Sequence, residues 1–127
     1  MLSIKLKNTE LPMLLNLSNH PSQIWPEGQM IAALNQYESV EDLPFPQINP
    51  EWTSDQVLQL AEEFENIIRE INPTAVHIMG ELTFTFSLVD KLKRIGFHCI
   101  ASTTKRNVTE KQGIKQSVFE FVRFRDY

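Results

Sequence analysis

Three short polar stretches hold residue types that could bind or transform a ligand. The first, Ser18-Asn19-His20, combines a hydroxyl, an amide and an imidazole. Histidine can act as a general acid or base near neutral pH, and the other two groups can hold a phosphate oxygen or a ribose hydroxyl. We therefore take Ser18, Asn19 and His20 as candidate catalytic residues. The alternative is that Ser18 and Asn19 only cap a turn and that His20 is a surface residue.

The other two stretches could bind an anionic ligand. If a helix begins near Glu81 in "GELT", it would turn free backbone N–H groups toward the ligand, and Glu81 itself could accept a hydrogen bond from a ribose or base. In "STTKR" hydroxyls precede two cations that can hold phosphate. The candidate ligand-binding residues are Gly80, Glu81, Thr83, Ser102, Thr103, Thr104, Lys105 and Arg106.

Each of these two stretches also has a purely structural interpretation. Glu81 could simply satisfy the helix dipole while Thr83 caps the helix, and "STTKR" could be a solvated turn. His77, inside a strand-like run, is expected to be a structural or interface histidine, and Trp25 to form a hydrophobic staple before a helix. Phe84 and Phe86 cannot share one helix face, so one should pack in the core and the other line a cleft or a partner surface.

Composition limits the function classes. A chain of 127 residues with 42% hydrophobic residues has the size and apolar content of one soluble globular domain. Its net charge of -4 disfavours binding to a long nucleic-acid duplex. The single cysteine, Cys99, is expected to be buried, and the three histidines are scattered, so the chain has no zinc-ligand spacing. It also has no glycine-rich nucleotide motif. Neither a metal nor a cofactor is therefore expected. No apolar run is long enough for a membrane span, which predicts a cytoplasmic protein.

The elements that would position these residues alternate between strand and helix. Buried or alternating apolar runs predict strands at residues 13–17, 40–43, 74–80, 97–102 and 117–125. Helical spacing predicts helices over residues 26–37, from a capping box at Thr53 and Gln56 to Ile71, and from Ser87 to Ile95. Residues 103–116 are expected to be a polar connection between the last two strands.

This order predicts an α/β fold, a three-layer Rossmann-like sandwich whose mainly parallel sheet ends in an antiparallel C-terminal strand. Residues 13–127 would form its single domain, and residues 1–12 an N-terminal extension or edge strand. A thioredoxin-like domain is the alternative, but the chain lacks the redox cysteine pair. Ligands of open parallel sheets bind beyond the carboxyl ends of the strands, where all three polar stretches would lie.

Four segments carry a resemblance to a known group: "LNLSNHP", "HIMGELTFTF", "CIASTTKR" and "FVRFRDY". Together they resemble small CRISPR-associated Rossmann-like proteins, akin to CARF sensors and ring nucleases, over roughly residues 13–127. The resemblance implies a homodimer that binds a cyclic oligoadenylate second messenger across its two-fold axis. In ring nucleases it also implies cleavage without a metal, through attack of a ribose 2′-OH on the adjacent phosphate.

The resulting hypothesis is an antiviral-defence protein that binds and cleaves a cyclic oligoadenylate. Ser18, Asn19 and His20 would position the 2′-OH and take its proton, and Lys105 or Arg106 with Thr103 would stabilise the developing charge. Two alternatives stay open. One is a non-enzymatic CARF-like module for nucleotide sensing or protein interaction, and the other is a hydrolase for another small nucleotide or phosphoester.

Overall fold

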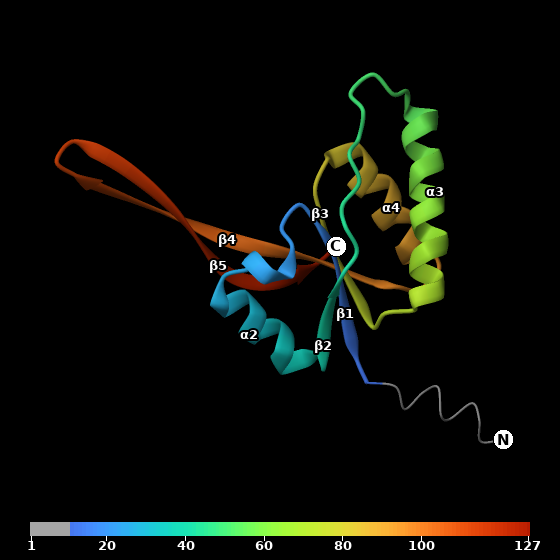
Figure 1. Ribbon diagram of the computed structural model, residues 1–127, viewed down its shortest axis with the longest axis horizontal. Helices are drawn as coiled ribbons and strands as arrows, with labels where there is room; N and C mark the ends of the chain where they lie inside the picture. The colour runs from blue at the N-terminus through green and yellow to red at the C-terminus, as the bar shows by residue number, and fades with distance from the viewer. Residues whose placement is uncertain (1–10) are drawn as a thin grey trace.

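Alternating strands and helices build one five-stranded sheet (Figure 1). The structure, a computed structural model, describes residues 11–127, so the extension or edge strand expected at residues 1–12 lies almost wholly outside the described residues. The strands are β1 (Met13–Ser18), β2 (Ser39–Asp42), β3 (Ala75–Met79), β4 (His98–Lys111) and β5 (Ile114–Asp126). The helices are η1 (Ser22–Ile24), α2 (Glu27–Gln36), α3 (Ser54–Ile71) and α4 (Leu82–Arg94).

The strand order is β2-β1-β3-β4-β5, with β1 to β4 parallel and β5 antiparallel to β4. This confirms the predicted α/β architecture with its antiparallel C-terminal strand. The chain leaves β1 toward β2 on one side and returns from β2 to β3 on the other. The order therefore reverses between β1 and β3, which is the switch point where open α/β sheets bind ligands.

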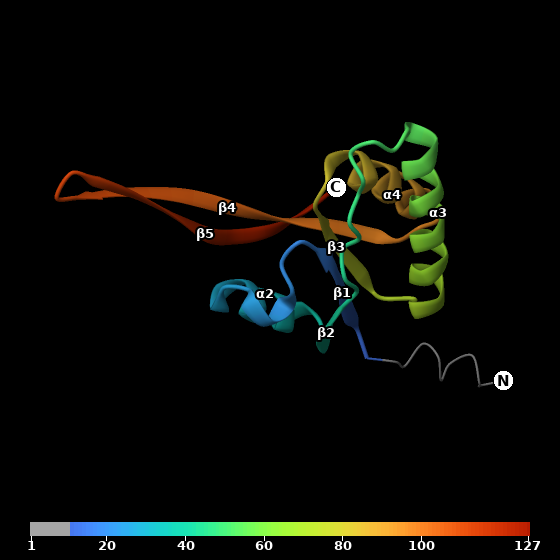
Figure 2. The ribbon, with the colours of Figure 1, turned by 45° about the horizontal axis from the view of Figure 1, so that its top comes forward.

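Strand alternation divides the core between the two faces of the sheet. Leu15, Leu17, Val76 and Ile78 pack on one face under α3 and α4, the larger core. The opposite face has a smaller core under α2, formed by Leu14, Trp25, Ala33, Tyr37, Ala75 and Ile100. Figure 2 shows α2 on the side of the sheet away from α3 and α4. Because α2 is the only long helix on its face among the described residues, that face is left partly open.

The prediction of a polar connection at residues 103–116 is wrong. β4 and β5 instead continue as a long two-stranded ribbon that projects from the body of the molecule (Figures 1 and 2). They are joined only by Gln112 and Gly113, with φ angles of 54° and 80°, the left-handed backbone that a two-residue hairpin turn requires. Cross-strand pairing runs from Ile100–Asp126 to Lys111–Ile114, so polar side chains do not prevent a strand here. We call residues 105–120 the arm.

α4 begins at Leu82, earlier than the expected start at Ser87. The reason is the side chain of Glu81, which accepts a hydrogen bond from the Phe84 N–H at 2.7 Å and so caps the helix. Thr83 is not the cap. Phe84 is fully buried and Phe86 is 74% exposed, which confirms that the two rings face different surroundings. Cys99 is buried, as expected, and burial raises the pKa of its thiol to about 11.

None of the helices within residues 11–127 combines the length and the apolar character that crossing a bilayer demands.

The start of α3 offers a test of the local stability that the sequence predicts. Thr53 Oγ1 accepts from the Gln56 N–H and the Gln56 side chain accepts from the Thr53 N–H, which completes the expected capping box. Thr53→Ala should lower the free energy of unfolding by about 1 kcal/mol, measured by urea denaturation. Ser54→Ala removes a hydroxyl one residue later and should change stability by less than half of that. Equal effects of the two substitutions would show that the box does not stabilise α3.

Candidate functional site

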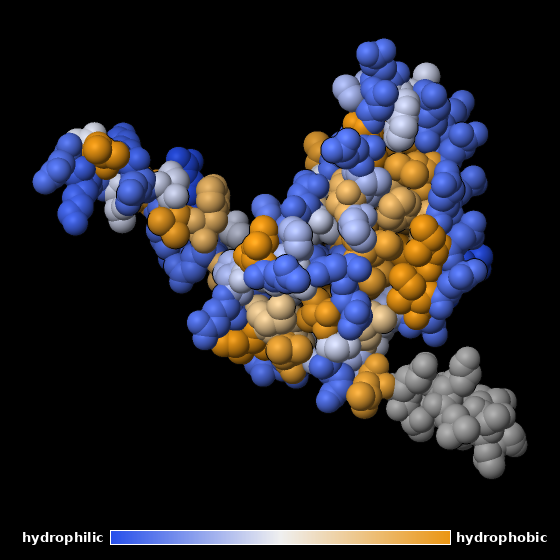
Figure 3. All heavy atoms as spheres, in the orientation of Figure 1, coloured by the Kyte–Doolittle hydropathy of each residue, from blue (hydrophilic) through white to orange (hydrophobic). Residues whose placement is uncertain are grey.

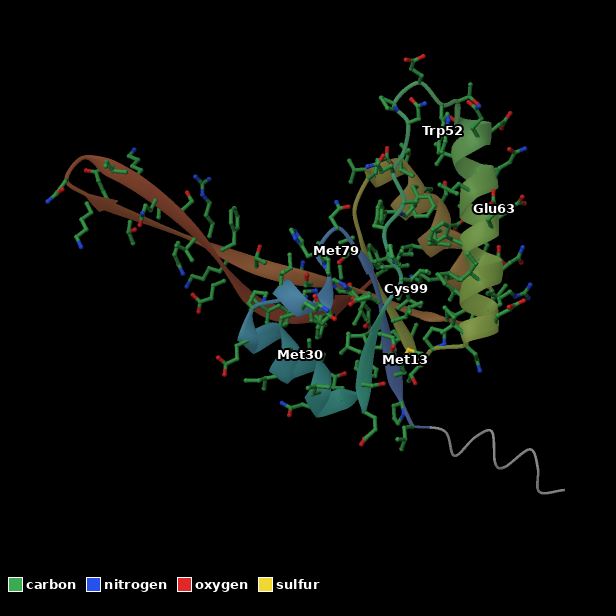
Figure 4. The ribbon with its side chains drawn as sticks, in the orientation of Figure 1. Met13, Met30, Trp52, Glu63, Met79 and Cys99 are labelled. Atoms are coloured by element: carbon green, nitrogen blue, oxygen red, sulfur yellow. The ribbon has the colours of Figure 1, made fainter. Side chains whose placement is uncertain are left out.

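A cleft of about 610 Å³ opens at the switch point, on the face of the sheet that α2 covers. The carboxyl ends of β1 and β3 meet there, because Ser18 pairs with Met79 and the Asn19 N–H donates to the Met79 carbonyl oxygen at 3.2 Å. Met79 is labelled in Figure 4. The segment from η1 to α2 forms one wall and the base of the β4–β5 hairpin the other. The cleft is lined by Ser18, Asn19, His20, Ile24, Trp25, Pro26, Gln29, His77, Met79, Gly80, Ser102, Thr104, Phe119 and Phe121.

Asn16, in the strand beneath the cleft, is 1% exposed and uses its amide in four directions. Its Nδ2 donates to the His20 carbonyl oxygen and to Asp42 Oδ1, both at 2.9 Å. Its Oδ1 lies 2.9 Å from Ser18 Oγ, which donates to it, and 2.9 Å from His77 Nδ1. Since both partners of Nδ2 are pure acceptors, the orientation of the amide is fixed, and Oδ1 must face Ser18 and His77.

His77 pairs in register with Asn16 and is 2% exposed. Because Asn16 Oδ1 can only accept, the proton of the neutral ring sits on Nδ1, and Nε2 carries a free lone pair. Nε2 is buried and has no hydrogen-bond partner within residues 11–127. Burial, with a smaller contribution from His20, lowers the pKa of His77 from 6.5 to about 4. The ring is therefore neutral at neutral pH.

Aromatic rings surround His77. Trp25 and Phe124 meet it edge-on, with ring centroids at 5.3 and 5.7 Å. Phe121 packs against Phe124 at 5.1 Å and lines the cleft itself. Trp25, expected to form a staple before α2, belongs to the smaller core against which Met30 packs, and its Nε1–H donates to the His20 carbonyl oxygen at 3.0 Å. This bond ties the wall of the cleft to the loop after β1.

The first predicted stretch lies in the cleft, but its three side chains are not equivalent. Ser18 Oγ is within hydrogen-bond distance of Asn16 Oδ1 and of the His20 carbonyl oxygen, and it accepts from the His20 N–H at 3.2 Å. Its hydroxyl is thus occupied in shaping the turn, as the structural alternative proposed. Asn19 and His20 are exposed and line the cleft. His20 is the side chain of the three with an imidazole open to a ligand.

In the second stretch, only Gly80 lines the cleft. Glu81 turns to the other side, where it caps α4 and lines a neighbouring pocket with Asn19 and Phe45. The Phe84 N–H and, to a smaller extent, the Thr83 hydroxyl hold the pKa of Glu81 below its ordinary value. The Thr83 hydroxyl donates to both Glu81 carboxylate oxygens at 2.8 Å. The geometry therefore places Glu81 and Thr83 at the start of a helix and outside the cleft.

Strand alternation splits the third stretch between two faces of β4. Ser102 and Thr104 line the cleft, whereas Thr103 faces away and donates to the Arg123 carbonyl oxygen at 3.1 Å. Lys105 follows Thr103 on the far face. Arg106 returns to the face of the cleft but lies on the arm, where its Nε and Nη2 donate to Ser117 Oγ at 3.1 and 3.0 Å. A loop could have brought all five side chains of residues 102–106 to the ligand, whereas a strand points them alternately to opposite faces.

The site includes residues that sequence reasoning missed. The sequence gives no site signal for Asn16, and His77 is expected only as a structural or interface histidine, because each is a single polar residue inside an apolar strand. The signal that could have found them is strand alternation. It places Asn16, Ser18 and His77 on the same face of the sheet, opposite the larger core. Phe119 and Phe121 are not expected in the site, because the sequence does not predict that the arm begins beside the cleft.

Asp42 completes the polar network around Asn16 and lines a neighbouring pocket with Ser18 and Asn19. Partial burial would raise the pKa of its carboxyl, but hydrogen bonds from Asn16 and from the Ser22 hydroxyl and N–H outweigh it and lower the pKa. Within residues 11–127, side chains of His, Cys, Asp and Glu form no group of three or more suited to hold a metal ion.

The fold and the cleft together define a Rossmann-like α/β domain with a ligand-sized cavity at its switch point. The chain belongs to the family described as the uncharacterized protein MJ1673 family, whose model matches residues 12–125. Among curated proteins and among solved structures, nothing matches the chain.

Gly80 is required by close packing. A Cβ added at this position would overlap the Phe45 ring, which itself packs edge-on against Phe84. Gly80→Ala should therefore destabilise the protein by about 1–3 kcal/mol in urea unfolding. Gly28→Ala is the matched control, because nothing lies within 4 Å of its added Cβ, and it should be neutral or slightly stabilising. The same loss at both positions would contradict the close approach of Phe45.

The depressed pKa of His77 predicts how stability varies with pH. The unfolded chain binds a proton near pH 6.5 and the folded chain only near pH 4, so the unfolded state holds more protons between these values. Stability should therefore fall as the pH decreases from 6.5 to 4, by on the order of 3 kcal/mol. Urea unfolding of the native protein and of His77→Phe, at several pH values, measures this slope.

His98 supplies the control for that slope, since it is half exposed and pairs with Asp126 at 2.7 Å. His98→Gln should keep the slope of the native protein, whereas His77→Phe should lose most of it. A slope that survives in His77→Phe would mean that the ring is not buried in its neutral form.

Proposed function

We propose that this protein acts in CRISPR-associated antiviral defence, by binding a cyclic oligoadenylate in the switch-point cleft and opening the ring without a metal. The observation that carries the proposal is the composition of the cleft. Polar groups of Ser18, Asn19, His20, Ser102 and Thr104 lie beside aromatic rings, at the edge of the sheet where such folds bind nucleotides.

The aromatic walls suit the bases of such a ligand. Trp25, Phe119 and Phe121 line the cleft from two different elements. Stacking of a base on an aromatic side chain contributes about 1–3 kcal/mol. The hydroxyls of Ser102 and Thr104 lie on the wall formed by the base of the β4–β5 hairpin. They can donate to phosphate oxygens or accept from ribose hydroxyls. A base held by the rings would thus place its ribose and phosphate near β4.

The proposed reaction is an intramolecular transesterification. The ribose 2′-OH attacks the adjacent phosphorus, a new P–O2′ bond forms and the P–O5′ bond breaks, which leaves a cyclic 2′,3′-phosphate and a free 5′-hydroxyl. His20 would take the proton of the 2′-OH, and the leaving 5′-oxygen would receive a proton in turn. Ser18 and Asn19 would position the loop, and Arg106, on the cleft side of β4, is the cation that a phosphate could recruit.

We further propose a cytoplasmic homodimer, in which a ring spans the clefts of two copies. The support is the open side of the cleft and its charge: none of the described residues that line it is Lys or Arg. A second copy would enclose the ring and could bring further basic residues to it.

A second candidate function is a nucleotide sensor or protein-interaction module that does not cleave. Two observations favour it. The Ser18 hydroxyl is already occupied by internal hydrogen bonds. The arm also exposes apolar side chains, among them Ile114, Val118 and Phe119. Figure 3 shows hydrophobic atoms among the hydrophilic ones along the arm.

Incubation with cyclic tri-, tetra- and hexa-adenylate separates the two functions. With a chelator present, we expect the pure protein to convert one of these rings to linear products that end in a cyclic 2′,3′-phosphate, followed by chromatography. Binding without products, measured by calorimetry, would support the sensor. If no ring is bound or cleaved, the proposal is wrong.

His20→Ala tests the assignment of the base. Loss of general base catalysis should slow cleavage by about 10²- to 10⁴-fold while the dissociation constant of the ring changes little. His98→Ala removes another exposed imidazole far from the cleft lining and should leave both quantities unchanged. Cleavage at the native rate in His20→Ala would remove His20 from the mechanism.

A further inference from the structure

We infer that His77 determines the specificity of the cleft, by accepting a hydrogen bond from an amino group of the ligand and so selecting adenine over a base that presents a carbonyl group there. The inference rests on the proposed function, because it requires a nucleotide base in the cleft. It adds a residue that the proposed reaction does not use.

The tautomer of His77 is set by Asn16 and by nothing in the ligand. Both amide protons of Asn16 are committed, one to the His20 carbonyl oxygen and one to Asp42. The amide oxygen must then face the His77 ring, and only a protonated Nδ1 can bond to it at 2.9 Å. Nε2 is consequently an acceptor in every neutral state of the site.

This acceptor is unsatisfied in the absence of a ligand. Nε2 is buried without a hydrogen-bond partner among the described residues, although His77 lines the cleft. The Phe124 ring beside it has no polar group, and the indole N–H of Trp25 already donates to the His20 carbonyl oxygen, so neither ring is free to hold a water molecule in its place. A ligand that moves part of this aromatic cover and brings an N–H to Nε2 therefore removes an unfavourable state as well as gaining a bond.

A base with a carbonyl group at the same position would do the reverse. Its oxygen lone pairs would face the lone pair of Nε2, and the ring cannot reverse its polarity because Asn16 fixes the tautomer. Protonation does not relieve the conflict near neutrality, since burial and the neighbouring His20 hold the pKa of His77 at about 4. The amino group of adenine and the carbonyl group of hypoxanthine occupy the same ring position with opposite hydrogen-bonding polarity, and the neighbouring N1 changes with them from an acceptor to a donor.

The test compares each adenylate ring, cyclic tri-, tetra- and hexa-adenylate, with the ring in which hypoxanthine replaces adenine. Calorimetry on the native protein should show about 10- to 100-fold tighter binding of the adenine ring. His77→Phe keeps a flat ring but no acceptor and should reduce this preference to less than about threefold. His77→Gln, whose amide can turn to present either an oxygen or an N–H, should bind both rings with similar affinity.

A second measurement does not depend on the folding of a variant. The ¹⁵N resonance of His77 Nε2 in the native protein should have the position of an unprotonated imidazole nitrogen, and should shift when the adenine ring binds and not when the hypoxanthine ring does. Equal affinities for the two rings, or an Nε2 resonance that ignores both, would overturn this inference and leave the proposed function standing. Failure of every adenylate ring to bind would overturn the proposed function, and this inference with it.

Discussion

The side-chain amide of Asn16 is the interaction on which the rest of the site depends. A polar side chain buried inside a strand destabilises a fold unless each of its groups finds a partner, and Asn16 meets this requirement with partners from four places. Asp42 belongs to β2, His77 to β3, Ser18 to the end of β1, and the His20 carbonyl oxygen to the loop beyond it. One amide thus joins the three strands around the switch point and orients the groups that face the cleft.

The His20 carbonyl oxygen passes this constraint on to the walls. It accepts hydrogen bonds from Asn16 and from the indole of Trp25, so the loop after β1 and the entry to α2 are held together by a single atom. Trp25 then packs against His77 and Phe124, and Phe124 packs against Phe121. The polar floor and the aromatic walls are therefore one connected arrangement, built from segments far apart in the sequence. The imidazole of His20 stays outside it, exposed, which suits a group that exchanges protons.

Sequence patterns were sufficient for the fold because each element carries its own local signal: apolar runs for β1 and β3, a capping box for α3, a helical stripe for α4. They also indicated that polar residues follow β1 and β3 at the carboxyl ends of the strands, but the switch point itself depends on the strand order, which the sequence does not specify. They failed where a structure depends on distant pairing. The arm has no continuous apolar run that would predict it, and its hairpin depends on cross-strand hydrogen bonds. The sequence therefore predicts Thr103 and Lys105 in the site, although both face away from the cleft. Asn16 and His77 orient each other through their hydrogen bond, and this pairing can be recognised only when β1 and β3 are known to be neighbours.

We propose that the cleft between the η1–α2 segment and the base of the hairpin is where this protein binds its ligand. The most direct measurement is the map of backbone amide chemical shifts during titration with a cyclic oligoadenylate. If the ligand binds in the cleft, the largest changes should fall on residues 18–20, on Trp25 and on Gly80, with smaller ones at Ser102 and Thr104. Changes confined to the outer face of α3 and α4, or to the tip of the arm around Gly113, would contradict it.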